Sequence, residues 1–164
     1  VQQVAQEIQP LLTAKQVQLT VWPAIINLEV PCDKVRIEQV VRNLLGNAIK
    51  FSQVGGKIEV TWEKLTLENE LLSEAIAVHI RDEGVGVPEN ELESIFDKFM
   101  QSSRTKTGAG GTGLGLSICR EIIRGHRGEI YARPAKDKGT IFTFWLPLKP
   151  SLNTLKRIGK NDGK

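Results

Sequence analysis

The sequence predicts an α/β (α+β) two-layer sandwich, in which a mixed, mostly antiparallel sheet is covered by helices on one face. Short segments with alternating apolar residues, typical of half-buried strands, lie at 17–22, 28–30, 57–63, 75–81, 129–133 and 140–147. Segments with apolar residues at helical spacing lie at 1–15, 34–51, 88–96 and 113–124. Strands therefore cluster at both ends of the chain with helices between them, which indicates one sheet and one helical layer.

The helix expected at 34–51 is the strongest of these elements. Asp33 is suited to its N-cap, because a carboxylate there can accept a hydrogen bond from the first turn. Pro10 interrupts the first predicted helix, and Gly125 ends the last one. The stripe expected to face the core is Ile37, Val40, Val41, Leu44, Leu45 and Ala48.

The composition excludes several classes of protein. A net charge of +3 is too small to indicate nucleic acid or a membrane surface, and the few aromatic residues form no basic–aromatic patch. No apolar run approaches the ~20 residues of a membrane span, so we expect no membrane contact by this domain. We expect one domain at 1–149 and a disordered, polar and basic tail at 150–164.

The cysteines indicate a reducing, cytoplasmic environment. Cys32 and Cys119 lie far apart with no C-x-x-C spacing, so we expect two reduced thiols. The chain begins at Val1 and its only methionine is Met100. We therefore interpret the sequence as part of a longer protein.

Three polar residues of the helix at 34–51 form a candidate site. Asn43, Asn47 and Lys50 fall within about 60° of one another on a helix of 3.6 residues per turn. Asparagine is a mediocre helix former, so two of them one turn apart need a reason. A solvated face explains such a pair alone, but the motifs that follow favour a binding site. The amide oxygen of Asn47 suits Mg²⁺, which prefers hard oxygen ligands, and Lys50 suits phosphate.

Asp82 ends the strand at 75–81 and has the parity of Val78 and Ile80, which places its carboxylate on the core side. A carboxylate there can accept a hydrogen bond from the exocyclic amine of adenine, which guanine lacks at that position. Gly84 and Gly86 let the backbone turn closely over such a base. For this segment alone, a surface turn is the alternative interpretation.

A glycine-rich run follows a polar loop. It can direct backbone amides and a positive helix end at phosphate oxygens. The residues expected to contact phosphate are Gly111, Thr112, Gly113, Leu114, Gly115 and Leu116. The run is not a P-loop, and its formal match to the dinucleotide pattern follows a loop instead of a strand. Arg104 and Lys106 in that loop can neutralise a terminal phosphate or face water.

Four motifs in this order resemble the catalytic, ATP-binding domain of bacterial-type sensor histidine kinases. This family belongs to the superfamily of gyrase, the mismatch-repair ATPases and a heat-shock chaperone. The motifs are an asparagine box at 43–51, an aspartate–glycine box at 82–86, a phenylalanine box at 96–99 and a glycine-rich box at 110–116. The segment 139–147 is also similar to the family's last strand, so the resemblance runs from Glu38 to Leu148.

The resemblance implies the Bergerat ATP-binding fold, with ATP between the helices. It implies Asn47 as the Mg²⁺ ligand, and Asn43 and Lys50 as catalytic residues near the phosphates. It also implies that Phe51 lies against the adenine and that Asp82 holds its amine.

The family further implies a lid over the nucleotide, formed here by 100–111. Many relatives carry an arginine just after the phenylalanine box, where this chain has Gln101. We therefore expect Arg104 or Lys106 to supply part of the γ-phosphate stabilisation.

Hydrolysing members of the superfamily carry a glutamate four residues before the magnesium asparagine, as the base that activates water. This chain has Asn43 there, an amide without useful basicity, and Glu38 points away from that face. A neutral imidazole needs no such base, so the sequence favours histidine phosphorylation. His79 has the parity of the other sheet face and His126 follows a helix end, so neither suits the acceptor. We expect the acceptor upstream of Val1.

The expected function is that of an ATP-dependent protein-histidine kinase. The domain would bind Mg-ATP and pass the γ-phosphate to a histidine on its own helical dimerisation domain, from which a response regulator receiver domain would take it. We expect an isolated monomer, a homodimeric parent, and a location in the cytoplasm or on the cytoplasmic portion of a membrane-anchored sensor. A superfamily ATPase and a non-catalytic ATP-sensing interaction module are the alternatives.

Overall fold

The computed structural model describes residues 1–23, 30–67, 73–105 and 111–148. Their strands form one five-stranded sheet in the order β1-β2-β3-β5-β4. The strands are β1 Gln18–Val21, β2 Lys57–Leu67, β3 Ser73–Asp82, β4 Glu129–Pro134 and β5 Thr140–Pro147. β1 pairs with β2 in parallel and every other pair is antiparallel. The predicted mixed, mostly antiparallel sheet is confirmed.

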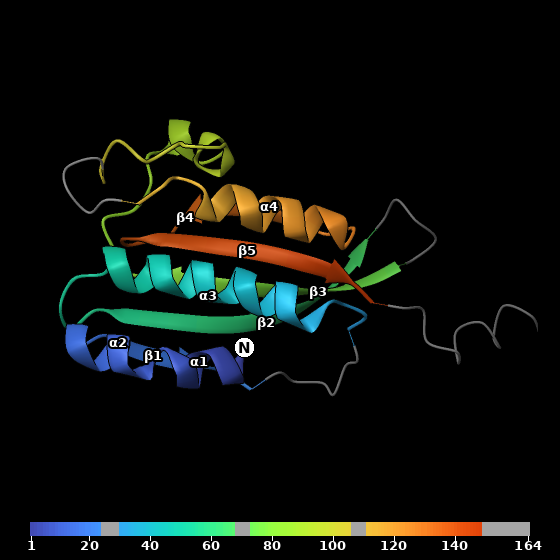
Figure 1. Ribbon diagram of the computed structural model, residues 1–164, viewed down its shortest axis with the longest axis horizontal. Helices are drawn as coiled ribbons and strands as arrows, with labels where there is room; N and C mark the ends of the chain where they lie inside the picture. Colours follow the sequence, from blue (N-terminus) through green and yellow to red (C-terminus); the bar gives the residue numbers. More distant parts are fainter. Residues whose placement is uncertain (24–29, 68–72, 106–110, 149–164) are drawn as a thin grey trace, which may run out of the picture.

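The helices lie on one side of this sheet (Figure 1). They are α1 Gln2–Glu7, α2 Gln9–Lys15, α3 Lys34–Phe51 and α4 Gly115–Gly125, with 3-10 turns η1 Glu89–Glu91 and η2 Ser94–Phe96. α3 has the predicted bounds, and the Asp33 carboxylate accepts a hydrogen bond from the Arg36 backbone N–H at 3.1 Å, as a cap should. Among the described residues, no helix is long and apolar enough to cross a bilayer.

The core lies between α3, α4 and the inner face of the sheet. The buried residues of α3 are Val40, Val41, Leu44, Leu45, Ala48 and Ile49, in agreement with the predicted stripe. Ile58 and Val60 of β2 and Ile80 of β3 meet them from the sheet, all fully buried. This packing holds α3 against β2 and against β3, the strand that ends at Asp82.

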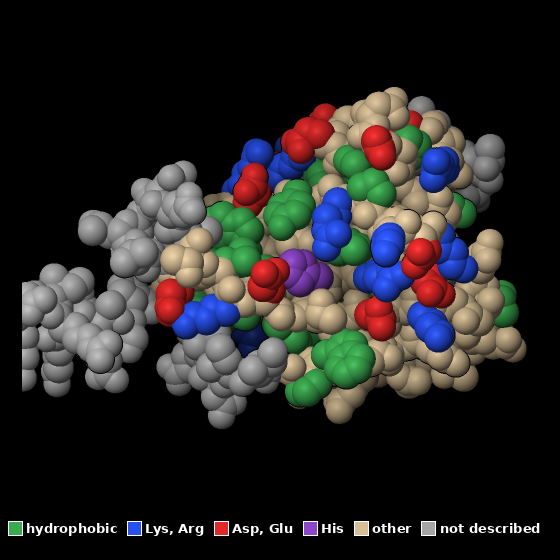
Figure 2. All heavy atoms as spheres, turned by 180° about the vertical axis from the view of Figure 1, so that it is seen from behind, with side chains coloured by type: hydrophobic (Ala, Val, Ile, Leu, Met, Phe, Trp, Pro, Cys, Tyr) green, Lys and Arg blue, Asp and Glu red, His purple; other side chains and the backbone are tan. Residues whose placement is uncertain are grey.

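The other sheet face carries polar and charged side chains of both signs among apolar ones (Figure 2). His79 lies on that face, as its parity predicted. Its Nδ1 is 2.9 Å from Thr143 Oγ1 and its Nε2 is 3.2 Å from Glu63 Oε2. A hydrogen-bonded histidine between neighbouring strands is consistent with a structural role.

Several predicted elements differ in their limits. The first helix is divided at Ile8, because Pro10 lacks an N–H and is tolerated only in the first turn of α2. The segment expected to be helical from 88 to 96 forms two 3-10 turns instead. β2 and β3 extend to Leu67 and from Ser73, since those residues pair across the hairpin.

Part of the predicted lid lies outside the described residues, and so do all or most of two other expected features. These are the tail at 150–164 and most of the short strand at 28–30, of which only Val30 is described and is not in a strand.

Candidate functional site

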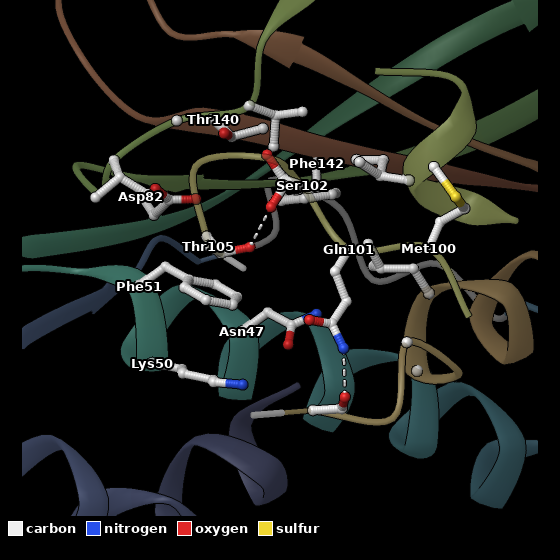
Figure 3. Close-up of a pocket in the computed structure, with 18 of the residues that line it drawn as sticks. Asn47, Lys50, Phe51, Asp82, Met100, Gln101, Ser102, Thr105, Thr140 and Phe142 are labelled. Carbon is white, nitrogen blue, oxygen red and sulfur yellow. Dashed lines mark hydrogen bonds between the residues drawn. The ribbon is translucent and has the colours of Figure 1, made fainter. Parts of the chain in front are cut away.

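A cavity of about 250 Å³ lies between the second half of α3, the loop after β3 and the loop before α4. The predicted contact residues that line it are Asn47, Lys50, Phe51, Asp82, Gly86, Gly111, Thr112, Gly113, Gly115 and Leu116. Residues as far apart in the sequence as Asn47 and Leu116 therefore meet at one site, as the motifs indicated. In Figure 3, Asp82 lies at one end of this group and Lys50 at the other, with Phe51 and Asn47 between them.

Asp82 is a buried residue, 5% exposed. Its Oδ1 accepts a hydrogen bond from the Gly84 backbone N–H at 2.8 Å. Burial raises the pKa of the Asp82 carboxyl, while hydrogen bonds from the backbone of Gly84 and Thr140 act in the opposite direction. A buried acceptor at the edge of an apolar cavity can select a ligand that brings a polar N–H group to it.

The surroundings of Asp82 depend on two glycines. A Cβ on Gly84 would lie 2.7 Å from the carbonyl oxygen of Phe51. Gly139 has φ +88°, and a Cβ there would lie 1.9 Å from the carbonyl oxygen of Asp82. Gly84 was predicted to allow a close backbone turn; it does not line the cavity, but it lets the loop after β3 approach α3.

No individual role was predicted for Gly139 or Thr140 from the sequence. The only signal for them was the likeness of 139–147 to a family strand. Thr140 is 2% exposed and lines the cavity beside Asp82. A glycine followed by a buried threonine at the start of β5 thus completes this end of the site.

One wall of the cavity is largely apolar and was not predicted, apart from Met100, which belongs to the predicted lid. It contains Val87, Ile95, Met100 and Phe142. Phe142 has the inward parity of its strand neighbours and faces Ile80 across β3 and β5, so alternation alone could have placed it. Such a wall suits a flat, uncharged ring.

The phenylalanine box supports this wall from behind. Phe96 is buried and makes an edge-to-face contact with Phe142, with ring centroids 6.3 Å apart. The Arg120 guanidinium of α4 lies 4.8 Å from the Phe96 ring centroid and pairs with Glu93 at 2.6 Å. The box therefore joins α4 to the cavity.

Two residues of the lid segment add polar groups to the cavity. Ser102 is 8% exposed, and its hydroxyl has no hydrogen-bond partner in the part of the chain that the structure describes. The Thr105 hydroxyl donates to the Ser102 carbonyl at 3.0 Å (Figure 3). Nothing in the sequence pattern distinguished these two from other loop residues.

At the other end of the cavity, α3 meets the glycine-rich loop. A Cβ on Gly111 would lie 3.2 Å from Lys50 Nζ, so the ammonium group lies beside loop backbone. Lys50 Nζ also lies 5.0 Å from the centroid of the Phe51 ring. Positive charge and unobstructed backbone together fit an anionic group.

Asn43 does not line the cavity. Its Nδ2 donates to the Gly115 carbonyl at 3.4 Å and lies 3.7 Å from Cys119 Sγ. It therefore joins α3 to the start of α4, one turn from Asn47. Cys119 is fully buried there, and burial raises the pKa of its thiol to about 11.

The glycine-rich loop is tied to the segment before it. Gly113 has φ +69°, and a Cβ there would lie 2.7 Å from the backbone of Phe99, whose N–H donates to the Gly113 carbonyl at 3.0 Å. The Gln101 side chain donates to the Gly111 carbonyl at 2.6 Å (Figure 3). Leu114 is the N-cap of α4 and not a lining residue.

Arg104 and Lys106 were both expected near the terminal phosphate, but only Arg104 lies within the described residues. Arg104 donates to the Val85 carbonyl at 2.9 Å and lies beside Gly86, so it contacts the loop after β3. Lys106 lies outside the described residues, as does the rest of the predicted lid from 107 to 110.

Comparison with known proteins identifies the family. A family model described as histidine kinase-, DNA gyrase B-, and HSP90-like ATPase matches residues 32–150. Sensor histidine kinase WalK of Bacillus subtilis (strain 168) is 39% identical over 124 residues, which are 75% of this chain and 20% of that protein. Adaptive-response sensory kinase SasA of Synechococcus sp. (strain JA-3-3Ab) is 38% identical over 150 residues, 90% of this chain and 37% of that protein. The chain thus spans well under half of either relative.

Solved structures agree with this result. The catalytic domain of histidine kinase ThkA superposes with a TM-score of 0.74 at 31% identity, over 91% of this chain and 92% of that one. ThkA in complex with the response regulator protein TrrA superposes with a TM-score of 0.72 at 29% identity, over 91% of this chain and 39% of that one. The chain has the Bergerat fold of these catalytic domains. It belongs to the histidine kinase-, DNA gyrase B- and HSP90-like ATPase family, and within that family it groups with the sensor histidine kinases.

Proposed function

We propose that residues 1–149 are the ATP-binding catalytic domain of a sensor histidine kinase. It binds Mg-ATP and passes the γ-phosphate to a histidine on a separate helical dimerisation domain. One observation carries the proposal: a single cavity has a buried carboxylate, Asp82, in an apolar wall at one end, and an ammonium group, Lys50, beside glycine backbone at the other. A purine, a sugar and a triphosphate present matching chemistry in that order.

The base end of this cavity fits adenine. The Asp82 carboxylate accepts the exocyclic amine, and Phe51 contacts the face of the ring. Gly84 lets the loop after β3 lie close to the end of α3, and Gly86 of the same loop lines the cavity. Guanine would bring a carbonyl oxygen to the carboxylate, which is repulsive.

The phosphate end fits a magnesium chelate. The Asn47 amide oxygen would hold Mg²⁺, which prefers hard oxygen ligands and would supply positive charge to a bound triphosphate. Lys50 and the backbone from Gly111 to Leu116 hold phosphate oxygens. Asn43 acts through the junction of α3 and α4. Arg104 is the cation of the lid segment that falls within the described residues.

The chemistry favours transfer to histidine over hydrolysis. The position of the hydrolytic base holds Asn43, whose amide donates to Gly115 and can accept no proton from water at neutral pH. In the transfer, a bond forms from the acceptor imidazole nitrogen to the γ-phosphorus, and the bond from that phosphorus to the bridging oxygen breaks as ADP leaves. The chain contributes position and positive charge to this step.

The partners follow from the same proposal. They are the helical dimerisation domain that carries the acceptor and the receiver domain of a response regulator, for which the ThkA–TrrA complex is a precedent. The isolated domain is a monomer of the cytoplasm or of the cytoplasmic part of an anchored sensor, and its parent is a homodimer. It has no nucleic-acid partner.

The test is a phosphotransfer assay. The chain is mixed with the dimerisation domain of its own parent protein and γ-labelled ATP, and acid-labile phosphate on the histidine is expected. Absence of that phosphate, with ATP binding intact, would refute the proposal. Steady phosphate release by the domain alone would favour an ATPase, and ATP-dependent partner affinity without protein phosphate would favour a sensing module.

We expect Asn47→Ala to weaken Mg-ATP binding by roughly 1–3 kcal/mol, because it removes a metal ligand, and to leave metal-free ATP binding unchanged. Calorimetric titration with ATP in magnesium and in EDTA measures both. Gln39→Ala, on the same helix outside the cavity, is the control. Equal losses with and without magnesium would show that Asn47 does not hold the metal.

A further inference from the structure

Lys15, the last residue of α2, contacts the end of α3 that faces the cavity. Its Nζ donates to the carbonyl oxygen of Ile49 at 2.7 Å and also to that of Lys50. The two helices are separated in sequence by β1 and the segment after it. One half-buried ammonium group thus binds two consecutive carbonyls of the helix that carries the phosphate-binding lysine.

The end of α3 needs such a partner. The last carbonyls of an α-helix have no intrahelical donor, and a left-handed glycine often returns the chain to supply one. α3 ends differently: Ser52 is extended, with φ −68° and ψ 150°, and its N–H reaches only the Ala48 carbonyl. Lys15 supplies donors to the next two carbonyls, and its charge is favourable at a helix C-terminus.

The same turn of α3 also supports the loop that follows Asp82. Lys50 and Phe51 line the cavity, and a Cβ on Gly84 would lie 2.7 Å from the Phe51 carbonyl oxygen. The turn is therefore held by Lys15 and contacts the Asp82 loop. A shift of this turn would move the phosphate end and the base end together.

We propose that Lys15 is a positioning residue for nucleotide binding: its ammonium fixes the last turn of α3, and with it Lys50, Phe51 and the loop that follows Asp82. This inference rests on the proposed function. Lys15 lies outside residues 32–150, which match the family model, so part of the support of the site comes from the preceding segment. Val4, Ile8 and Leu12 of that segment are buried in the same core as α3.

A purely electrostatic role would give a different result. A cation near the phosphates would strengthen the binding of ATP and leave adenosine, which has no charge, unaffected. A positioning role acts on Phe51 and Asp82 as well, so it changes the affinity for both ligands by a similar factor.

The experiment compares Lys15→Met with wild type in the 164-residue chain. We expect ATP and adenosine each to bind about 10-fold more weakly, in titrations followed by calorimetry and by NMR respectively. Lys15→Arg, which keeps the charge and the donors, should restore both to within about 3-fold. Glu7→Gln removes another contact between the first helices and α3, the ion pair with Arg42 at 2.5 Å, and should change neither.

A second measurement needs no nucleotide and separates this inference from the proposed function. In the ligand-free protein, Lys15→Met should shift the backbone amide resonances of Phe51, Ser52 and Gly84 more than Glu7→Gln does. Unchanged resonances, unchanged affinity, or a loss confined to ATP would each overturn the positioning role. Failure of wild type to bind ATP would refute the proposed function, while the resonances still decide the role of Lys15. If Lys15→Met does not fold, Lys15→Gln is used with the same criteria.

Discussion

The Asp82→Asn variant is expected to bind ATP roughly 1–3 kcal/mol more weakly and, without ligand, to resist unfolding better than wild type at neutral pH. The loss of affinity follows because an amide cannot present two acceptor oxygens to the adenine amine and to Gly84 together. The gain in stability follows because the ionised carboxylate is buried, and burial outweighs its backbone hydrogen bonds in its effect on the pKa.

The stability difference should depend on pH in one direction. The pKa of Asp82 is raised in the folded protein above its ordinary value of 3.8. As pH rises, the unfolded chain loses this proton first, so the wild-type protein loses stability from about pH 3.8 up to the raised pKa. Below that pH window Asp82 is protonated in both the folded and the unfolded protein, and its contribution to stability is fully present. Above the window Asp82 is ionised in both, and this contribution is completely lost.

Urea unfolding of both proteins between pH 3 and pH 7 measures this effect. The advantage of Asp82→Asn should grow with pH across the window. Asp137→Asn, at an exposed carboxylate paired with Arg81 at 3.6 Å, should show no such growth. A variant that is less stable than wild type at pH 7, or whose ATP affinity is unchanged, would contradict the role assigned to Asp82.

The Gly139→Ala variant is expected to lose about 2–5 kcal/mol of folding free energy and its measurable ATP affinity. The residue has φ +88°, and its Cβ would lie 1.9 Å from the carbonyl oxygen of Asp82. Backbone cannot move aside as the end of a long side chain can. The substitution therefore displaces the residue that we propose to hold adenine.

Gly55→Ala is a matched control for this prediction. Gly55 also has a positive φ, +77°, but no atom lies within 4 Å of its Cβ position. It should lose only the cost of the left-handed conformation, about 1–2 kcal/mol, and should keep its ATP affinity. Equal losses in the two variants, measured by urea unfolding, would refute the steric role of Gly139.

Local patterns predicted the elements that carry the site. The bounds of α3 were correct because its N-cap, Asp33, and its apolar stripe are both signals within the helix itself. Strand parity placed Asp82 inside and His79 outside, since alternation needs no knowledge of distant residues. The 3-10 turns after Pro88 were predicted as a helix because a short helical pattern does not distinguish the two.

Contacts between distant segments had no such signal. Asn43 was expected among the phosphates, but it bonds to Gly115 and Cys119 because α4 packs beside it. Gly139 approaches Asp82 because β3 and β5 are neighbouring strands. The pattern of residues within either strand does not predict that they pair. Packing between elements decides these details of the site.

The parallel pairing of β1 with β2 has a practical consequence for recombinant work. Gln18 to Val21 of β1 lie opposite Lys57 to Val60. A fragment cut at residue 32, where the family match begins, would leave that flank of the sheet without its neighbour. Open strand backbone recruits strands from other molecules. Aggregation of such a truncated fragment would then result from the loss of β1 and would not be a property of the longer polypeptide.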